Sequence, residues 1–323
     1  MNIQAKLFVH KYQPIYLSDF GMDPEIIELL DTMISMDNLN LLICGNMASG
    51  KTSLLNSLIR EYYKNYNSKG YDDNVLYINS LKEQGINYYR TDVKTFCQTC
   101  SVIKGKKKIV VLDDIDLINE QSQQVFRNCI DKFSHNVHFI SSCCNVQKVI
   151  ESLQSRFAMI KIKPLGRDNL TKLITKIKHA EQIEIDDDAE QFIVNVSNTT
   201  VKLLVNYMEK FKLLDERITL PIAMQLCSNI SFRTFEEYTQ LIKQQNTVTA
   251  IQLIYEIYDK GYSVMDILDN YFLFIKTTTL LSEDDKYTII PYICKYITMF
   301  HNIHEDEIEL ALFTNNLVGC FQV

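Results

Sequence analysis

The feature that most constrains this chain is an eight-residue loop that directly follows a short apolar run. Residues 45–52 read GNMASGKT and fit the pattern of a glycine, any four residues, and then Gly-Lys-Thr. The run before the loop, LNLLIC (39–44), is typical of a buried strand, and residues 53–66 after it have helical spacing. A strand, a glycine-rich loop and a helix in this order predict a phosphate-binding loop, because backbone N–H groups at a helix N-terminus favour an anion.

The residue types in this loop indicate binding of ATP together with Mg²⁺. Lys51 is expected to reach the β- and γ-phosphates, and the Thr52 hydroxyl is expected to coordinate the metal. The alternative, a glycine turn beside a surface lysine, is disfavoured by the strand and helix around the loop. The nucleotide-binding residues expected here are Gly45, Asn46, Met47, Ala48, Ser49, Gly50, Lys51, Thr52 and Ser53.

A second apolar run ends in aspartates further along the chain. Residues 108–114, KIVVLDD, predict a buried strand that brings Asp113 to Mg²⁺ through a water molecule. Asp114 stands where many such enzymes place the carboxylate that polarises the attacking water. Alone, four apolar residues before an aspartate are more often a plain strand end. The phosphate loop upstream is what favours the metal-binding interpretation.

Strand-like runs that alternate with helical stretches predict an α/β fold with a parallel sheet in the first half of the chain. Further strand candidates are residues 74–79, 137–144 and 158–164. After Pro164 the sequence contains long helical patterns and few strand runs, which predicts an all-α region. We expect a boundary near residues 164–166 and a second one near either residues 220–221 or residues 228–233.

Composition limits the classes of function. The net charge is −7, with 33 basic and 40 acidic residues, so the surface as a whole does not attract nucleic acid and any DNA contact requires a local patch. No run of 18 apolar residues predicts a membrane span. Nine cysteines are scattered without a signal peptide before them, which favours a reducing, intracellular compartment. Cys97 and Cys100 lack the second pair that a zinc site needs.

An ordered series of motifs resembles the small subunits of replication factor C, the AAA+ clamp loader. FVHKYQPIYLSDF (8–20) is similar to the family's opening Trp-Val-Glu-Lys-Tyr-Arg-Pro, and QSRF (154–157) resembles its Ser-Arg-Cys box. Residues 122–145 resemble the helix and strand that end in the sensor-1 asparagine, and residues 250–268 look like the collar domain. The resemblance covers nearly the whole chain. It implies an AAA+ ATPase core (1–164), a helical lid (165–228) and a helical collar domain for oligomerisation (229–323).

The resemblance also implies roles for single residues. Val9 and Tyr12 would line the adenine pocket, and Lys202 stands at the position of the sensor-2 arginine. Asn145 would be sensor 1, although a strand-end amide that caps a turn is the alternative. Arg156 would be the arginine finger that completes a neighbour's ATP site. The implied catalytic set is Lys51, Thr52, Asp113, Asp114, Asn145 and Arg156.

The expected partners are other clamp-loader subunits in a pentameric ring, a sliding clamp and primer–template DNA. Arg90 and Lys94 lie one helical turn apart, on a stretch that in the family lines the DNA chamber, where they would bind phosphates. The alternative for both residues is a solvated helix face. The resemblance implies a nucleus or a viral replication site as the location. Low Gly and Trp contents fit an AT-rich genome, such as that of a large DNA virus.

Four positions depart from the family pattern: Gln13 and Lys202 replace arginines, Phe157 replaces a cysteine, and Asp114 replaces a glutamate. Clamp loading driven by ATP hydrolysis is the function that the resemblance implies. A subunit that binds ATP without hydrolysing it is the alternative, which Asp114 and Lys202 favour and the intact GNMASGKT loop opposes. A different AAA+ replication ATPase is a third hypothesis, and it would need a DNA-binding appendage that the sequence does not show.

Overall fold

The computed structural model of this chain describes residues 7–66, 68–80, 85–197, 200–227, 230, 232–300 and 304–321. The chain divides into two compact units. The first unit comprises Met1–Leu170 and Thr199–Val205, and the second comprises Thr171–Asn198 and Asn206–Val323. The three-domain division with boundaries near residues 164 and 228 stays a proposal.

A five-stranded parallel sheet forms the centre of the first unit, in the order β2-β3-β4-β1-β5. Each strand lies inside one of the runs that the sequence predicts as strands. Because the strands are parallel, their carboxyl ends meet at one edge of the sheet, where open α/β sheets bind ligands. The strands are β1 (Leu41–Cys44), β2 (Val75–Asn79), β3 (Lys108–Asp113), β4 (Val137–Cys143) and β5 (Ala158–Lys161).

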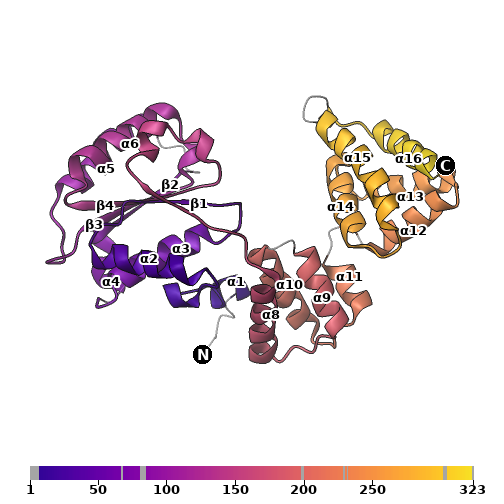
Figure 1. Cartoon of the computed structure of the whole chain (residues 1–323), viewed down its shortest axis with the longest axis horizontal. Coiled ribbons are helices and arrows are strands. Elements are labelled where there is room, and N and C mark those ends of the chain that lie inside the picture. Colours follow the sequence, from indigo (N-terminus) through magenta and orange to yellow (C-terminus); the bar gives the residue numbers. More distant parts are fainter. Residues whose placement is uncertain are drawn as a thin grey trace. The chain divides into compact units, whose positions relative to one another are not determined.

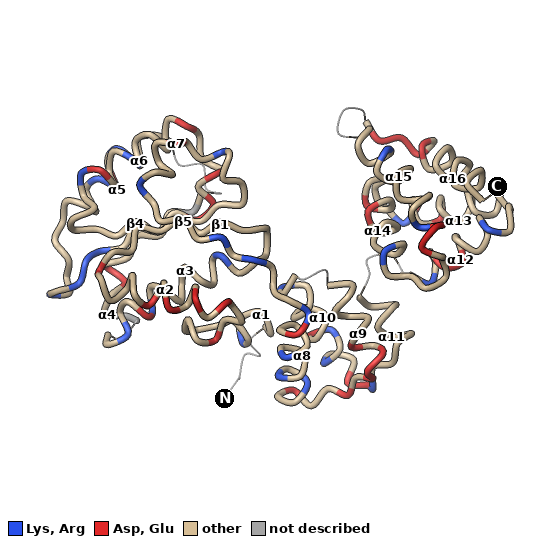
Figure 2. The backbone as a smooth tube through the Cα atoms, in the orientation of Figure 1, with Lys and Arg blue, Asp and Glu red and all other residues tan. Residues whose placement is uncertain are grey.

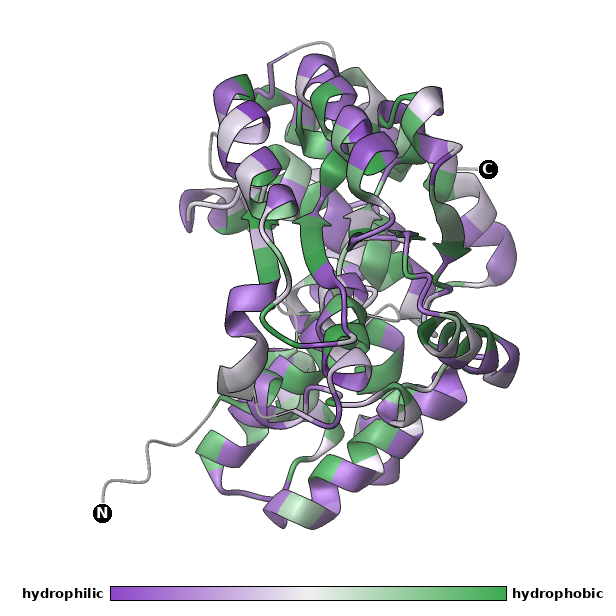
Figure 3. Ribbon diagram, turned by 90° about the vertical axis from the view of Figure 1, so that its left-hand side faces the viewer, coloured by the Kyte–Doolittle hydropathy of each residue, from purple (hydrophilic) through white to green (hydrophobic). Residues whose placement is uncertain are grey.

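Helices cover both faces of this sheet (Figure 1). One face carries α5 (Ile86–Gln98), α6 (Glu120–Phe133) and the short α7 (Glu151–Gln154), whose apolar residues share one cluster. The other face carries α2 (Pro24–Ser35), α3 (Lys51–Tyr62) and α4 (Ser68–Tyr71). The helix α1 (Phe8–Lys11) precedes them. The central strands are therefore buried on both sides, and Figure 3 shows them as hydrophobic segments.

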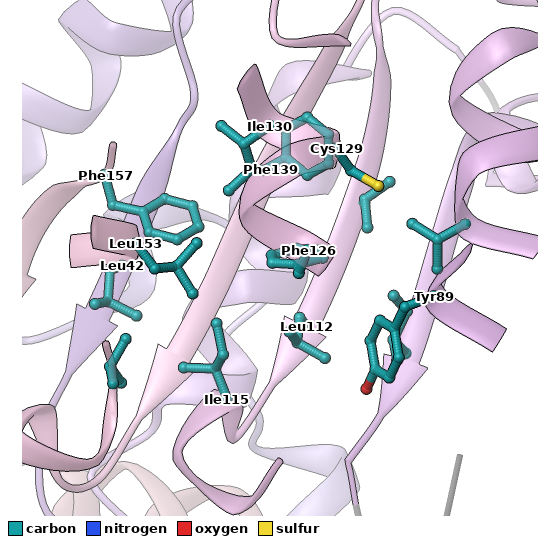
Figure 4. Packing of buried hydrophobic residues seen from close by; sticks show 14 of the residues in the cluster. Leu42, Tyr89, Leu112, Ile115, Phe126, Cys129, Ile130, Phe139, Leu153 and Phe157 are labelled. Atoms are coloured by element: carbon teal, nitrogen blue, oxygen red, sulfur yellow. The ribbon is translucent and has the colours of Figure 1, made fainter. Parts of the chain in front are cut away.

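Alternation along the strands divides the apolar side chains between the two faces. In β3, Val110 and Leu112 belong to the cluster under α5 and α6, whereas Ile109 and Val111 belong to the cluster under α3. Helix α6 begins at Glu120 after Asn119, whose side chain accepts a hydrogen bond from the Ser122 N–H as an N-cap. The packing below α6 is shown in Figure 4, where the rings of Phe126 and Phe139 meet edge to face with centroids 5.5 Å apart.

Beyond residue 164 the described residues form helices, together with an isolated bridge between Ile185 and Ile218. The expected all-α character is confirmed. None of the described helices is both long enough and apolar enough to cross a bilayer. The helices are α8 (Arg167–Glu181), α9 (Asp187–Val196), α10 (Val201–Leu214), α11 (Leu220–Leu226), α12 (Phe232–Lys243), α13 (Thr247–Asp259), α14 (Val264–Thr277), α15 (Glu283–Phe300) and α16 (Ile308–Cys320).

Several aromatic side chains in the core of the second unit pack against one another. Phe232 of α12 packs edge to face against Phe192 of α9 and Phe274 of α14. Tyr238 is fully buried, and its hydroxyl lies 2.8 Å from the Thr314 hydroxyl of α16, so the polar end of this ring has a partner. Helices α9, α12, α14 and α16 are thus joined through one aromatic cluster.

A buried histidine joins β4 to the turn after α2. The His138 ring is 1% exposed. Its Nδ1 accepts a hydrogen bond from the Leu39 N–H at 3.3 Å, so the ring proton lies on Nε2, which donates to Asp37 Oδ1 at 3.0 Å. Burial lowers the pKa of His138 to about 4, and this effect outweighs the attraction of the Asp37 carboxylate. The neutral ring is therefore part of the folded structure.

We predict that His138 makes the chain less stable in mild acid. Its pKa is lower in the folded state than the ordinary value of about 6.5 in the unfolded state, so the unfolded chain binds more protons as the pH falls below that value. The free energy of unfolding should fall by about 2 kcal/mol between pH 7 and pH 5 because of this group alone. Denaturant titrations of the wild type and His138→Gln measure it. Equal losses in both proteins would contradict the prediction.

Candidate functional site

The phosphate loop follows β1 and leads into α3, as the sequence predicts. A Cβ atom on Gly45 would lie 2.9 Å from Ser49 Oγ and 3.2 Å from the Ile162 carbonyl oxygen, so a glycine is required there. Gly50 has a φ of +91° at the start of α3. Ala48 also has a positive φ, of 57°, which costs on the order of 1–2 kcal/mol for a residue with a Cβ. Such strain in a glycine-rich loop is typical of a binding site.

The ammonium group of Lys51 is buried, and it is satisfied by hydrogen bonds. It donates to the carbonyl oxygens of Gly45 at 3.0 Å and Asn46 at 2.9 Å, and to Cys144 Sγ at 3.1 Å. The residue is 6% exposed. A buried charge without partners would be costly, so these contacts hold Lys51 at the loop. The interaction with Cys144 at the end of β4 was not expected from the sequence.

The Asp113 carboxylate is held by hydroxyl groups on both sides. Thr52 Oγ1 donates to Asp113 Oδ2 at 2.8 Å, and Ser142 of β4 donates to Oδ1. Ser80, which directly follows β2, donates a hydrogen bond from its hydroxyl to the Asp113 carbonyl oxygen. Sequence reasoning missed both serines. The feature of the sequence that could have identified them is a small polar residue at the carboxyl end of each strand next to β3.

A hydroxyl and a carboxylate in contact are the oxygen ligands that Mg²⁺ prefers, so Thr52 and Asp113 fit this ion. The described residues contain no group of three or more carboxylate, imidazole or thiol side chains able to hold a metal.

The three aspartates of IVVLDDID have different surroundings. Asp116 Oδ2 accepts hydrogen bonds from the backbone N–H groups of Cys144 and Asn145, at 3.2 and 2.9 Å, so it joins the turn after β3 to the end of β4. Asp114 has left-handed backbone angles, and its N–H donates to Ser142 Oγ at 2.9 Å. Its carboxylate accepts no hydrogen bond from the described part of the chain. Burial, followed by the nearby Asp113 charge, raises the pKa of Asp114.

Asn145 follows β4 beside this group of side chains. Its Oδ1 accepts a hydrogen bond from the Gln147 N–H at 2.9 Å, which caps the short turn after the strand. The Asn145 side chain thus caps a turn at the end of the strand, which is the alternative to a role as sensor 1. Its neighbour Cys144 contacts Lys51, so Asn145 is nevertheless adjacent to the phosphate loop.

The N-terminal segment reaches α3 by a different contact from those expected. Gln13 Nε2 donates to Ser53 Oγ at 3.1 Å, which ties this segment to the first turn of α3. Val9 and Tyr12 are half-buried. A cavity of about 270 Å³ lies beside the loop, but neither of these two residues lines it. The lining consists of Phe20, Gly21, Met22, Asp23, Ile26, Ser49, Gly50, Ile162, Lys163, Pro164, Leu165, Gly166 and Asn169.

The remaining candidates lie on other elements. Arg156 follows α7 and pairs with Asp131 of α6 rather than with the phosphate loop. Arg90 and Lys94 are exposed on α5, where Figure 2 shows basic segments among acidic ones. Lys202 is exposed in the first turn of α10. The expected roles of these four residues stay proposals.

A buried glutamine connects the turn after β3 to the segment that carries Arg156. Gln123 of α6 is 1% exposed. Its Nε2 donates to the carbonyl oxygens of Ile118 and Lys148, at 3.1 and 2.9 Å, and its Oε1 accepts from the Ile150 N–H at 2.9 Å. Sequence reasoning missed this residue, because a glutamine among polar helix residues is normally a surface position.

Comparisons with known proteins agree with this arrangement. Residues 41–165 match the family described as "ATPase family associated with various cellular activities (AAA)". A protein of Methanococcus maripaludis named replication factor C small subunit is 28% identical over 290 residues, which cover 89% of this chain and 90% of that one. Replication factor C subunit 5 of Mus musculus is 27% identical over 271 residues, which cover 83% and 79%.

A protein of Acanthamoeba polyphaga mimivirus, also named as a replication factor C small subunit, is 25% identical over 83% of both chains. Among solved structures, the Thermotoga maritima RuvB branch migration motor has a TM-score of 0.53 at 14% identity, covering 72% of this chain and 79% of that one. Domain III of the replication initiation protein DnaA from the same organism has a TM-score of 0.51 at 18% identity, covering 66% and 95%. These two structures show the fold alone. The chain is a homologue of the replication factor C small subunits and carries an AAA ATPase domain.

Proposed function

We propose that this chain is a clamp-loader subunit that binds ATP with Mg²⁺ and hydrolyses it to place a sliding clamp on primer–template DNA. The observation that carries the proposal is the contact between the Thr52 hydroxyl and the Asp113 carboxylate, beside the buried Lys51. It occurs in a chain whose relatives named replication factor C small subunit match most of its length. The phosphate loop and the strand-end carboxylate are the two parts that a phosphate-loop ATPase needs.

In this proposal Lys51 exchanges its three present partners for phosphate oxygens, and the loop N–H groups bind the same phosphates. Thr52 and Asp113 would hold Mg²⁺. When bound, the ion neutralises charge on the phosphates. Asp114 accepts a proton of the attacking water, because its carboxylate faces no donor in the described residues.

Further residues complete the proposed site. Asn145 acts as sensor 1 once its side chain leaves the Gln147 N–H, and Lys202 contacts the nucleotide from the lid. Val9 and Tyr12 contact the adenine, and they approach through the segment that Gln13 ties to α3. Arg156 acts on the ATP of a neighbouring subunit.

The proposed partners are other clamp-loader subunits, a sliding clamp and DNA. Residues 229–323 form the proposed collar through which the subunits assemble, and Arg90 and Lys94 bind DNA phosphates. All nine cysteines are free thiols, which fits the proposed reducing location in a nucleus or a viral replication site.

The test of the function is clamp loading by the complex assembled with its partner subunits. Lys51→Ala should weaken ATP binding at this site at least about 100-fold, because it removes the charge that faces the phosphates. Clamp loading should fall with it. Lys64→Ala, which removes an exposed lysine from the turn after α3, is the matched control and should leave both unchanged. Normal ATP binding by Lys51→Ala would contradict the proposal.

A second prediction concerns the length of Asp114. Its side chain is one methylene shorter than the glutamate of the family, so the carboxylate stops about 1 Å short of the water, and misplacement on this scale costs up to about 100-fold in rate. Asp114→Glu should therefore cleave ATP faster with unchanged affinity. Single-turnover cleavage in the assembled complex measures this, with the other sites silenced by Lys→Ala in their loops. If cleavage is no faster, Asp114 does not face the water.

A third prediction concerns DNA. Replacing Arg90 and Lys94 together by alanine should weaken binding equally for all sequences, because phosphate contacts carry no base information. The slope of log affinity against log salt should drop by about 1 for each lost contact. Lys172→Ala with Lys176→Ala is the matched control, since these exposed lysines are also one turn apart, on α8. Equal slopes for both double variants would place Arg90 and Lys94 on a solvated face.

A further inference from the structure

The guanidinium group of Arg156 is held by a carboxylate from another helix. Arg156 Nε donates to Asp131 Oδ1 at 2.7 Å, and Nη2 donates to Oδ2 at 3.3 Å, so the pair has two contacts. Asp131 belongs to α6, and Arg156 follows α7, 25 residues later in the chain. A two-point contact of this kind sets the direction of the guanidinium plane as well as its position.

The remaining donors of Arg156 are also largely engaged. Nη1 donates to the Ser152 carbonyl oxygen at 2.6 Å and to Ser155 Oγ at 3.0 Å. A guanidinium has five N–H donors, and these four contacts leave one hydrogen of Nη2. The side chain is 30% exposed. A phosphate can therefore approach the outer edge of the group without displacing Asp131, which holds the inner Nε edge.

Asp131 is itself fixed on α6. Arg127, one turn earlier, places Nη2 3.2 Å from Asp131 Oδ2. The hydrogen bond from Arg156 lowers the pKa of the Asp131 carboxyl, and the Arg127 charge lowers it further, so the group is ionised. Arg127 stands on the same helix as Asp131, so it restrains the carboxylate locally.

We propose that Asp131 is a positioning residue for Arg156, which presents its guanidinium to the ATP of a neighbouring subunit. This rests on the proposed function, in which Arg156 completes that neighbouring site. A long arginine side chain loses much rotamer freedom when it meets a phosphoryl group, and the Asp131 pair removes part of that freedom beforehand. An exposed ion pair contributes little to stability, so the expected effect of Asp131 is on the rate of ATP cleavage rather than on folding.

Single-turnover ATP cleavage in the assembled complex tests the proposal, with only the neighbouring site left active. Asp131→Ala should slow cleavage by about 10- to 100-fold, the loss expected from misplacing a group that acts in the transition state. The ATP affinity of that site and the midpoint of thermal unfolding should stay unchanged. Asp131→Glu should restore part of the rate, because it keeps the carboxylate.

Asp186→Ala is the matched control. Asp186 accepts from Arg217 Nε at 2.8 Å in another exposed aspartate–arginine pair, outside the proposed site. Its loss should leave cleavage unchanged. Equal slowing by this variant and by Asp131→Ala would mean that the effect of Asp131 is not specific, and would overturn the proposal.

Arg156→Ala separates this inference from the function on which it rests. If Arg156→Ala leaves cleavage unchanged, the proposed role of Arg156 is wrong. If it slows cleavage and Asp131→Ala does not, or if Asp131→Ala speeds cleavage, Asp131 does not position Arg156. In the double variant, Asp131→Ala should add no loss beyond that of Arg156→Ala. A further loss there would show that Asp131 acts through another route, and the proposal would be overturned.

Discussion

The hydrogen bond between the Thr52 hydroxyl and the Asp113 carboxylate is the interaction on which the site depends. It joins the first turn of α3 to the end of β3, two elements that meet only because the strands are parallel and β4 alone separates β3 from β1. Ser142 of that intervening strand donates to the other oxygen of Asp113. The sheet order therefore brings three chain segments to one carboxylate, and a change of register would separate them.

Buried polar groups connect this site to the rest of the first unit. Lys51, Gln123 and His138 are each less than a tenth exposed, and each has hydrogen-bond partners on a different part of the chain. Because an unpaired buried polar group is costly, such networks favour one arrangement of the elements. Gln123 joins the turn after β3 to the segment before Arg156. The turn that follows Asp113 and the segment that leads to Arg156 are thus joined by hydrogen bonds within one subunit.

The fold could be predicted largely from the sequence, because strand periodicity and the phosphate loop are local patterns. Each strand lies inside its predicted run, and the loop leads into α3 at Lys51 as expected. The partners of the site residues could not be predicted in the same way. Ser142 lies near the carboxyl end of β4, next to a second serine, and Asp131 and Gln123 lie among the polar residues of α6. Their roles depend on residues that are distant in sequence.

The three aspartates of IVVLDDID also show the difference between what local sequence predicts and what depends on residues distant in the chain. The sequence by itself determined that a buried strand ends there in carboxylates, because burial and hydropathy are properties of the residues. Only the tertiary structure decided what each carboxylate contacts: Asp113 meets Thr52 and Ser142, and Asp116 meets the backbone at the end of β4. Asp114 faces no donor among the described residues. The physical reason is that a hydrogen bond needs a partner within about 3 Å, and the sheet order, rather than local sequence, brings these partners together.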